Sequence, residues 1–212
     1  MIEGMENATR EALGSYFEAL GKKAPVDWEQ LPDLGLYLDQ VITFLERQLD
    51  FFKMPGDEGQ ITPSMINNYA KSGLVPRTVG KKYGQEHLAL LLSVFTLKRV
   101  LSVQDMAALL GDQGGADEAR EFYRRFRESM RRAAESTAQA VGDALPDLSG
   151  EGAVPDCKTL RSVALELAAG ASMRSRAAEL LLALAVSGEA AARPETAKAP
   201  PKPKKAPRGE KA

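Results

Sequence analysis

The chain has 212 residues, of which 44% are hydrophobic, and its formal net charge is −1. This length exceeds one small domain and is short for two large ones, and the apolar content suffices for a buried core. The longest mostly apolar run, residues 88–97, is about half of the roughly twenty residues that cross a membrane. The acidic N-terminus has no basic stretch leading into an apolar one. We therefore expect a cytoplasmic protein without membrane partners.

Cys157 is the only cysteine of the chain and His87 the only histidine. They exclude an intramolecular disulfide and the usual zinc sites, and a catalytic triad would have to recruit His87. The sequence also lacks a glycine-rich phosphate-binding motif. We expect structural roles for both residues, and no metal, no cofactor and no enzymatic activity.

The near-zero net charge conceals a strong segregation along the chain. Residues 1–59 contain five Lys or Arg against twelve Asp or Glu, whereas residues 60–104 contain six against one. Residues 193–212 are again basic, with seven against two. Local charge of one sign is informative about partners rather than about the fold.

Apolar residues recur at helical spacing in most of the chain. The pattern predicts helices over residues 5–20, 33–52, 62–72, 85–100, 103–111, 117–145 and 158–187. The second has a core stripe made of Leu34, Leu38, Val41, Leu45, Leu49 and Phe52, and Gly170 is the expected break in the last. Residues 146–156 are expected to be a linker. From about Glu189 the composition becomes Ala, Pro, Lys and Glu, which predicts a disordered tail.

The helix over residues 62–72 has local signals at both ends. Thr62 followed by Pro63 is typical of a helix start, and Gly73 suits the left-handed residue that ends a helix. The loop over residues 75–83 suits two short extended arms around a glycine-containing turn. Ser102 and Asp105 are placed for a capping box at the start of the helix over 103–111.

A short capped helix between two buried helices, followed by a basic loop, has the plan of a winged helix-turn-helix. Ser64, Asn67, Asn68 and Lys71 would face outward while Ile66 and Tyr69 face the core. Asparagine can bind an adenine edge with two hydrogen bonds, and Lys81 and Lys82 suit phosphate contacts. Each feature alone is also compatible with an ordinary solvated turn or helix face.

The stretches ITPSMINNYAKSGLVP, GKKY, EHLALL and RVLSVQDMAALL occur here in one order. Together they resemble the N-terminal domain of MerR-like regulators. With the preceding LPDLGLYLDQVITFLERQL, residues 31–112 are similar to a bacterial family described only as a domain of unknown function, with that winged core. The resemblance implies DNA-facing roles for Thr62, Ser64, Met65, Asn67 and Asn68, and places Lys81 where a wing arginine usually lies. The arginines usual in the recognition helix are here Ser64 and Asn67.

In MerR-type proteins the long helix after the DNA-binding domain pairs antiparallel in a dimer. The helix over residues 117–145 has the corresponding place. Its candidate seam consists of Phe122, Phe126, Met130, Ala133 and Thr137. The alternative is that this helix folds back on residues 158–187 of the same chain. We favour a homodimer because one recognition helix with so few cations would bind DNA weakly.

We therefore expect a mainly all-α protein. Its parts are an N-terminal helix and connector (1–30), a MerR-like winged helix-turn-helix domain (31–112), a helical dimerisation or effector region (117–188) and a disordered basic tail (189–212). The expected function is a transcriptional regulator that binds double-stranded DNA. Its candidate DNA-binding residues are Thr62, Ser64, Met65, Asn67, Asn68, Lys71, Arg77, Lys81 and Lys82. The alternatives are a protein-interaction module that keeps the winged fold and an architectural DNA-bending factor; the sequence does not specify a small-molecule or protein effector.

Overall fold

The computed structural model is mainly helical and describes residues 14–16, 19, 25–50, 61–78, 80–111, 115–145 and 155–192. Its elements are η1 (Trp28–Gln30), α2 (Leu38–Leu49), α3 (Pro63–Lys71), α4 (Gln85–Leu97), α5 (Val103–Leu110), α6 (Ala116–Ala144) and α7 (Cys157–Ala192). The described residues form no β-strand, and Leu36 and Tyr83 form an isolated antiparallel bridge. The prediction of a mainly all-α fold is confirmed. Among the helices of the described ranges, we find none that combines the length and the hydrophobicity of a membrane span.

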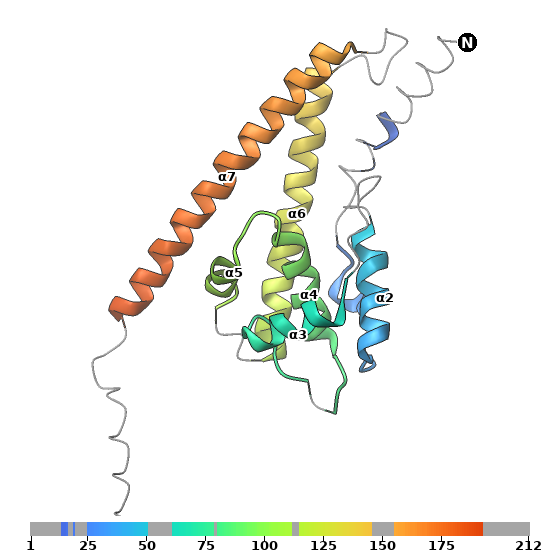
Figure 1. Ribbon diagram of the computed structural model, residues 1–212, viewed down its shortest axis with the longest axis vertical. Helices are drawn as coiled ribbons and strands as arrows, with labels where there is room; N and C mark the ends of the chain where they lie inside the picture. Colours follow the sequence, from blue (N-terminus) through green and yellow to red (C-terminus); the bar gives the residue numbers. More distant parts are fainter. Residues whose placement is uncertain are drawn as a thin grey trace, which may run out of the picture.

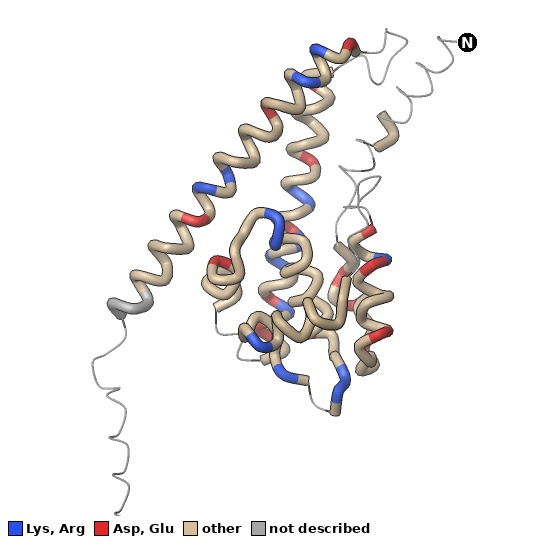
Figure 2. Tube along the Cα trace, viewed as in Figure 1, with Lys and Arg blue, Asp and Glu red and all other residues tan. Residues whose placement is uncertain are grey.

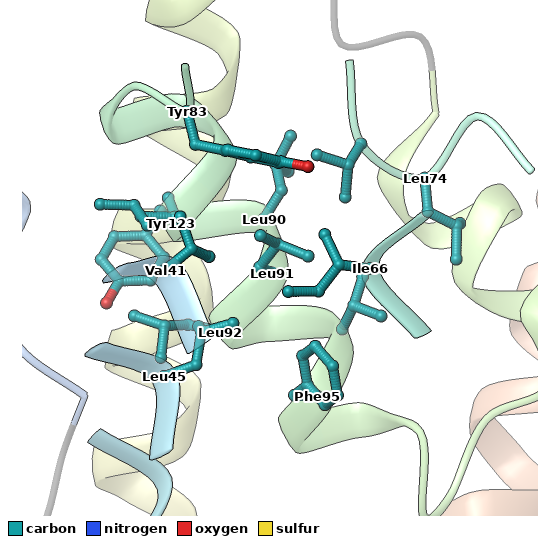
Figure 3. Close-up of a cluster of buried hydrophobic side chains, with 14 of the residues drawn as sticks. Val41, Leu45, Ile66, Leu74, Tyr83, Leu90, Leu91, Leu92, Phe95 and Tyr123 are labelled. Carbon is teal, nitrogen blue, oxygen red and sulfur yellow. The ribbon is translucent and has the colours of Figure 1, made fainter. Parts of the chain in front are cut away.

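Helix α4 lies at the centre of the core. It packs against α2 and α6 (Figure 1), and all nine of its residues from 87 to 95 are buried. Figure 3 shows Leu91 surrounded by side chains from three other helices, namely Val41, Leu45, Ile66 and Tyr123. A helix covered on most of its circumference must be apolar on most faces, which explains the leucine-rich sequence of α4.

The segment before α2 is fastened to the first half of α6. The Tyr123 hydroxyl donates a hydrogen bond of 2.9 Å to the Val26 carbonyl, and Arg127 Nε donates one of 2.7 Å to the Pro25 carbonyl. The Trp28 and Tyr123 rings meet edge to face. Burial raises the pKa of the Tyr123 hydroxyl well above its usual value. The folded unit therefore includes residues 25–30 and the first half of α6, beyond the 31–112 boundaries expected from the sequence.

Helix α2 begins at Leu38, five residues later than residue 33, where the apolar pattern had placed its start. The preceding residues are held in another conformation because Leu36 pairs with Tyr83. Gln40 Oε1 then accepts the Tyr37 N–H at 2.9 Å, which fixes the helix start. Leu34 consequently lies outside the core stripe, with 75% of its surface exposed.

Two other expectations on this part of the chain fall mostly on residues that the structure does not describe. Of the helix expected over residues 5–20, the structure describes only residues 14–16 and 19, and these are helical. Phe52, the last residue of the expected core stripe, lies outside the described ranges.

Helix α7 is one continuous helix of 36 residues that passes through Gly170, so the predicted break is wrong. A glycine inside a helix costs about 1 kcal/mol relative to alanine, which is too little to interrupt a helix of this length. Most of the predicted linker over residues 146–156 and of the predicted disordered tail over residues 189–212 lies outside the described residues. The tail prediction is wrong at its start, because α7 continues to Ala192.

Helix α7 returns alongside α6 in the opposite direction and then diverges from it (Figure 1). Near the start of α7, Leu160, Val163 and Leu167 pack against Val141 and Leu145. Further along, α7 contacts α5, and Ser175 Oγ donates a hydrogen bond of 2.8 Å to the Val100 carbonyl. The end of α6 thus packs against the start of α7, and a later part of α7 packs against α5.

Candidate nucleic-acid interface

Both ends of α3 have the local geometry that the sequence predicts. Thr62 Oγ1 accepts the Met65 N–H at 3.3 Å, and Pro63 occupies the first helical position. At the other end Gly73 has φ +79°, and the Leu74 N–H donates to the Tyr69 carbonyl at 3.0 Å. This pattern is a Schellman motif, which satisfies carbonyls at the end of a helix and turns the chain back.

One face of α3 is fixed in the core. Ile66 is fully buried, and the Tyr69 ring meets the Phe95 ring edge to face with 5.4 Å between centroids. Burial also raises the pKa of the Tyr69 hydroxyl. Leu74 and Val75, just after the helix, are buried as well. These contacts determine which side of α3 faces solvent.

The opposite face of α3 is exposed. All six of the candidate residues that belong to this segment are exposed, namely Thr62, Ser64, Met65, Asn67, Asn68 and Lys71. They present hydroxyl, thioether, amide and ammonium groups and no carboxylate. A short helix with this surface has donors and acceptors but no fixed negative charge.

The basic loop that follows α3 turns tightly at Gly80 and Lys81. Their φ angles are +62° and +61°, and two consecutive left-handed residues are typical of a type I′ turn. Arg77, Lys81 and Lys82 are all exposed. At the end of the loop, Tyr83 exchanges two backbone hydrogen bonds of 2.9 Å with Leu36.

Lys82 is held by the segment before α2. Its Nζ lies 5.6 Å from the centroid of the Tyr37 ring, in cation–π geometry. Its stem crosses Gly35, where an added Cβ would lie 3.0 Å from Lys82 Cβ. Gly35, Leu36 and Tyr37 therefore support the loop, and sequence reasoning missed them because contacts over nearly fifty residues leave no periodic signal.

The charges of residues 60–104 are arranged asymmetrically. Figure 2 shows Lys and Arg on α3 and on the loop after it, together at one end of the molecule. Glu86, the one acid of this segment, is turned toward the start of α4, where its carboxylate lies 2.8 Å from His87 Nδ1. Lys98 Nζ lies 4.8 Å above the Phe95 ring. Within residues 60–104, α3 and the loop after it therefore expose cations and no carboxylate.

His87 and Cys157 occupy different environments. His87 is 6% exposed, and its Nδ1 accepts the Gly84 N–H at 3.1 Å. Cys157 is exposed at the start of α7. Within the described ranges no group of three His, Cys, Asp or Glu side chains is placed to hold a metal ion.

The candidate dimer seam on α6 is largely in contact with its own chain. Phe126 is buried, and Phe122 and Met130 pack against the same core. Thr137 is half-buried and bonds to the Ala133 carbonyl at 2.8 Å. A shallow groove of about 460 Å³ remains, lined by Leu97, Leu109, Phe122, Arg125, Phe126, Ser129, Met130 and Ala133.

A family model described as a domain of unknown function (DUF1836) matches residues 26–126. No curated protein and no solved structure matches the chain. The chain thus contains a DUF1836 domain over these residues. Its bounds coincide with the structural unit, because Val26 provides the carbonyl that Tyr123 binds and Phe126 is the last buried side chain of the main core.

Proposed function

We propose that the chain is a DNA-binding transcriptional regulator with a MerR-like winged helix-turn-helix core, in which α3 enters the major groove and the loop over residues 76–83 contacts phosphates. The observation that carries the proposal is the division of α3 into two faces. Ile66 is fully buried on one side, whereas Ser64, Asn67 and Lys71 are exposed on the other.

The exposed groups of α3 suit base recognition. The major groove is about 12 Å wide and admits an α-helix. An asparagine amide can donate to adenine N7 and accept from adenine N6–H, and apolar atoms such as those of Met65 can contact the thymine methyl group. Pairs of this kind discriminate between bases by about 1–3 kcal/mol each.

The loop suits a different role. Arg77 and Lys81 project from a turn beside α3 and are exposed. Cations at such a position neutralise phosphates and release counterions, which contributes affinity without sequence preference. Because one chain offers few such cations, the proposed regulator is a dimer that places two α3 helices about one duplex turn or a multiple of it apart.

Binding of the purified full chain to duplex fragments of genomic DNA, measured by fluorescence anisotropy at increasing salt, tests the proposal. We expect binding at low salt and a steep loss of affinity as salt increases. Arg77→Glu with Lys81→Glu should weaken binding to every fragment. Lys158→Glu with Arg161→Glu makes the same charge change at exposed positions of α7 and should leave affinity within a factor of about two. Absence of binding at low salt would contradict the proposal and favour a protein-interaction module.

A further inference from the structure

The side chain of Lys82 lies against a segment that is distant from it in the sequence. Its Nζ is 5.6 Å from the centroid of the Tyr37 ring, and its stem passes over Gly35. A Cβ at position 35 would lie 3.0 Å from Lys82 Cβ and 3.2 Å from Lys82 Cδ. The glycine therefore leaves the space through which the stem reaches the ring.

The backbone places Lys82 and Tyr37 opposite each other. Leu36 and Tyr83 form an antiparallel bridge and exchange two hydrogen bonds, so the next pair along the two segments is Tyr37 with Lys82. A pair next to a hydrogen-bonded one brings its side chains closer together. Its side chains also point to the opposite face from those of the bridge. Because Tyr83 points into the core, Tyr37 and Lys82 point to solvent.

Both groups are open to a ligand. Tyr37 is 53% exposed, and Lys82 is exposed as well. An aromatic ring attracts an ammonium group without cancelling its charge, whereas a carboxylate partner at the same position would neutralise it. A lysine that is held by a ring keeps its charge for a phosphate.

We infer that Tyr37 is a positioning residue of the proposed DNA interface, whose ring holds the Lys82 ammonium in place for a phosphate of the duplex. The inference rests on the proposed function and adds the segment before α2 to the interface. A lysine side chain has large rotamer entropy, and fixing such a side chain on binding lowers affinity by roughly two- to tenfold. The contact with Tyr37 removes much of this loss, because Lys82 is ordered before DNA binds.

The first experiment measures the affinity of the full chain for a random-sequence duplex by fluorescence anisotropy at low salt. Such a duplex reports contacts with phosphates, which carry no sequence information. Tyr37→Leu should weaken binding by roughly two- to tenfold, because leucine has no ring to attract the ammonium. Tyr37→Phe should bind like the wild type, because phenylalanine retains the ring. Equal losses in the two variants would overturn the inference.

A double-mutant cycle determines whether Tyr37 acts through Lys82. Lys82→Ala should weaken binding and reduce the slope of log affinity against log salt by about one. In that background Tyr37→Leu should have no further effect. Arg77→Ala is the matched control, because Arg77 is an exposed cation of the same loop, and in its background Tyr37→Leu should again cause its full loss. Additive losses from Tyr37→Leu and Lys82→Ala would contradict a positioning role.

The substitutions at position 37 leave the start of α2 intact. The bond to Gln40 Oε1 comes from the Tyr37 backbone N–H, which leucine and phenylalanine also provide. The side chain itself is more than half exposed, so its replacement leaves the core unchanged. Equal far-UV circular dichroism and equal urea midpoints of wild type and variants check that the fold is retained.

The second experiment measures the contact itself, without DNA. The ring current of Tyr37 should shift the Lys82 side-chain protons upfield in NMR spectra of the full chain, and Lys82→Ala identifies these signals by their loss. The shift should persist in Tyr37→Phe and disappear in Tyr37→Leu. Unshifted Lys82 signals in the wild type would overturn the inference and leave DNA binding by α3 standing. A wild type that binds no duplex would instead overturn the proposed function and the inference together, so the two failures are distinguishable.

Discussion

Leu36 and Tyr83 exchange two backbone hydrogen bonds of 2.9 Å each, although 47 residues separate them in the sequence. The pair fastens the end of the basic loop to the segment before α2. Tyr83 is 7% exposed, and its ring meets the His87 ring edge to face. Burial raises the pKa of the Tyr83 hydroxyl. The position of the exposed lysines thus depends on a contact far from them in the chain.

Leu36→Pro should release the loop, because proline has no N–H to donate to the Tyr83 carbonyl. We expect the free energy of unfolding to fall by about 1–3 kcal/mol, measured by urea denaturation, and DNA affinity to fall with it. Leu34→Pro, in the same segment but outside the bridge, is the control. Equal destabilisation by the two substitutions would show that the bridge does not hold the loop.

Lys81→Gly should separate stability from binding. Lys81 has φ +61°, a conformation that costs an L-residue about 1–2 kcal/mol and glycine almost nothing. After allowing for the greater entropy of glycine in the unfolded chain, we expect unfolding to become harder by about 0.5 kcal/mol. DNA affinity should decrease because a phosphate contact is lost. A variant that is more stable and binds as tightly as the wild type would remove Lys81 from the interface.

Asn67→Ala should change sequence preference more than stability. Asn67 is exposed on α3, so its truncation leaves the core intact, and alanine favours the helix. We expect the ratio of affinities for preferred and random duplexes to fall by roughly tenfold, equivalent to about 1.4 kcal/mol. Lys71→Ala should instead weaken both duplexes in proportion. If Asn67→Ala behaves like Lys71→Ala, the asparagine does not contact a base.

Tyr123→Phe tests whether α6 belongs to the folded unit. Tyr123 is fully buried, and its hydroxyl is the donor to the Val26 carbonyl. Removing the hydroxyl leaves that carbonyl without this donor, and the expected loss is about 1–3 kcal/mol in the free energy of unfolding. Thermal denaturation should show one cooperative transition at a lower midpoint. An unchanged midpoint would mean that the segment before α2 docks without this bond.

The sequence predicts best what is decided locally. Thr62-Pro63 and Gly73 determine the ends of α3 through contacts within five residues. Ser102 and Asp105 form the expected capping box in the same way, with the Asp105 N–H 3.1 Å from Ser102 Oγ. The alternation of Ile66 with Ser64, Asn67 and Asn68 also follows from helical spacing. These features needed no knowledge of the rest of the chain.

Features that depend on distant residues were missed or misplaced. The start of α2 was predicted at residue 33 because Leu34 continues its apolar pattern, yet the Leu36–Tyr83 bridge holds the preceding residues in another conformation and the helix begins only at Leu38. The contribution of α6 to the core was likewise not visible from spacing, because Phe126 fits either a dimer seam or an internal contact equally well. Periodicity identifies an apolar face but does not identify what covers it.

Methylation of guanine N7 by dimethyl sulfate in a duplex selected by the full chain tests the central claim most directly, because N7 lies in the major groove. If α3 enters that groove, guanines in the selected site should be protected when the wild-type chain is bound, and protection should be lost with Arg77→Glu and Lys81→Glu at the same protein concentration. Unchanged N7 methylation in a duplex that is fully bound would contradict the claim.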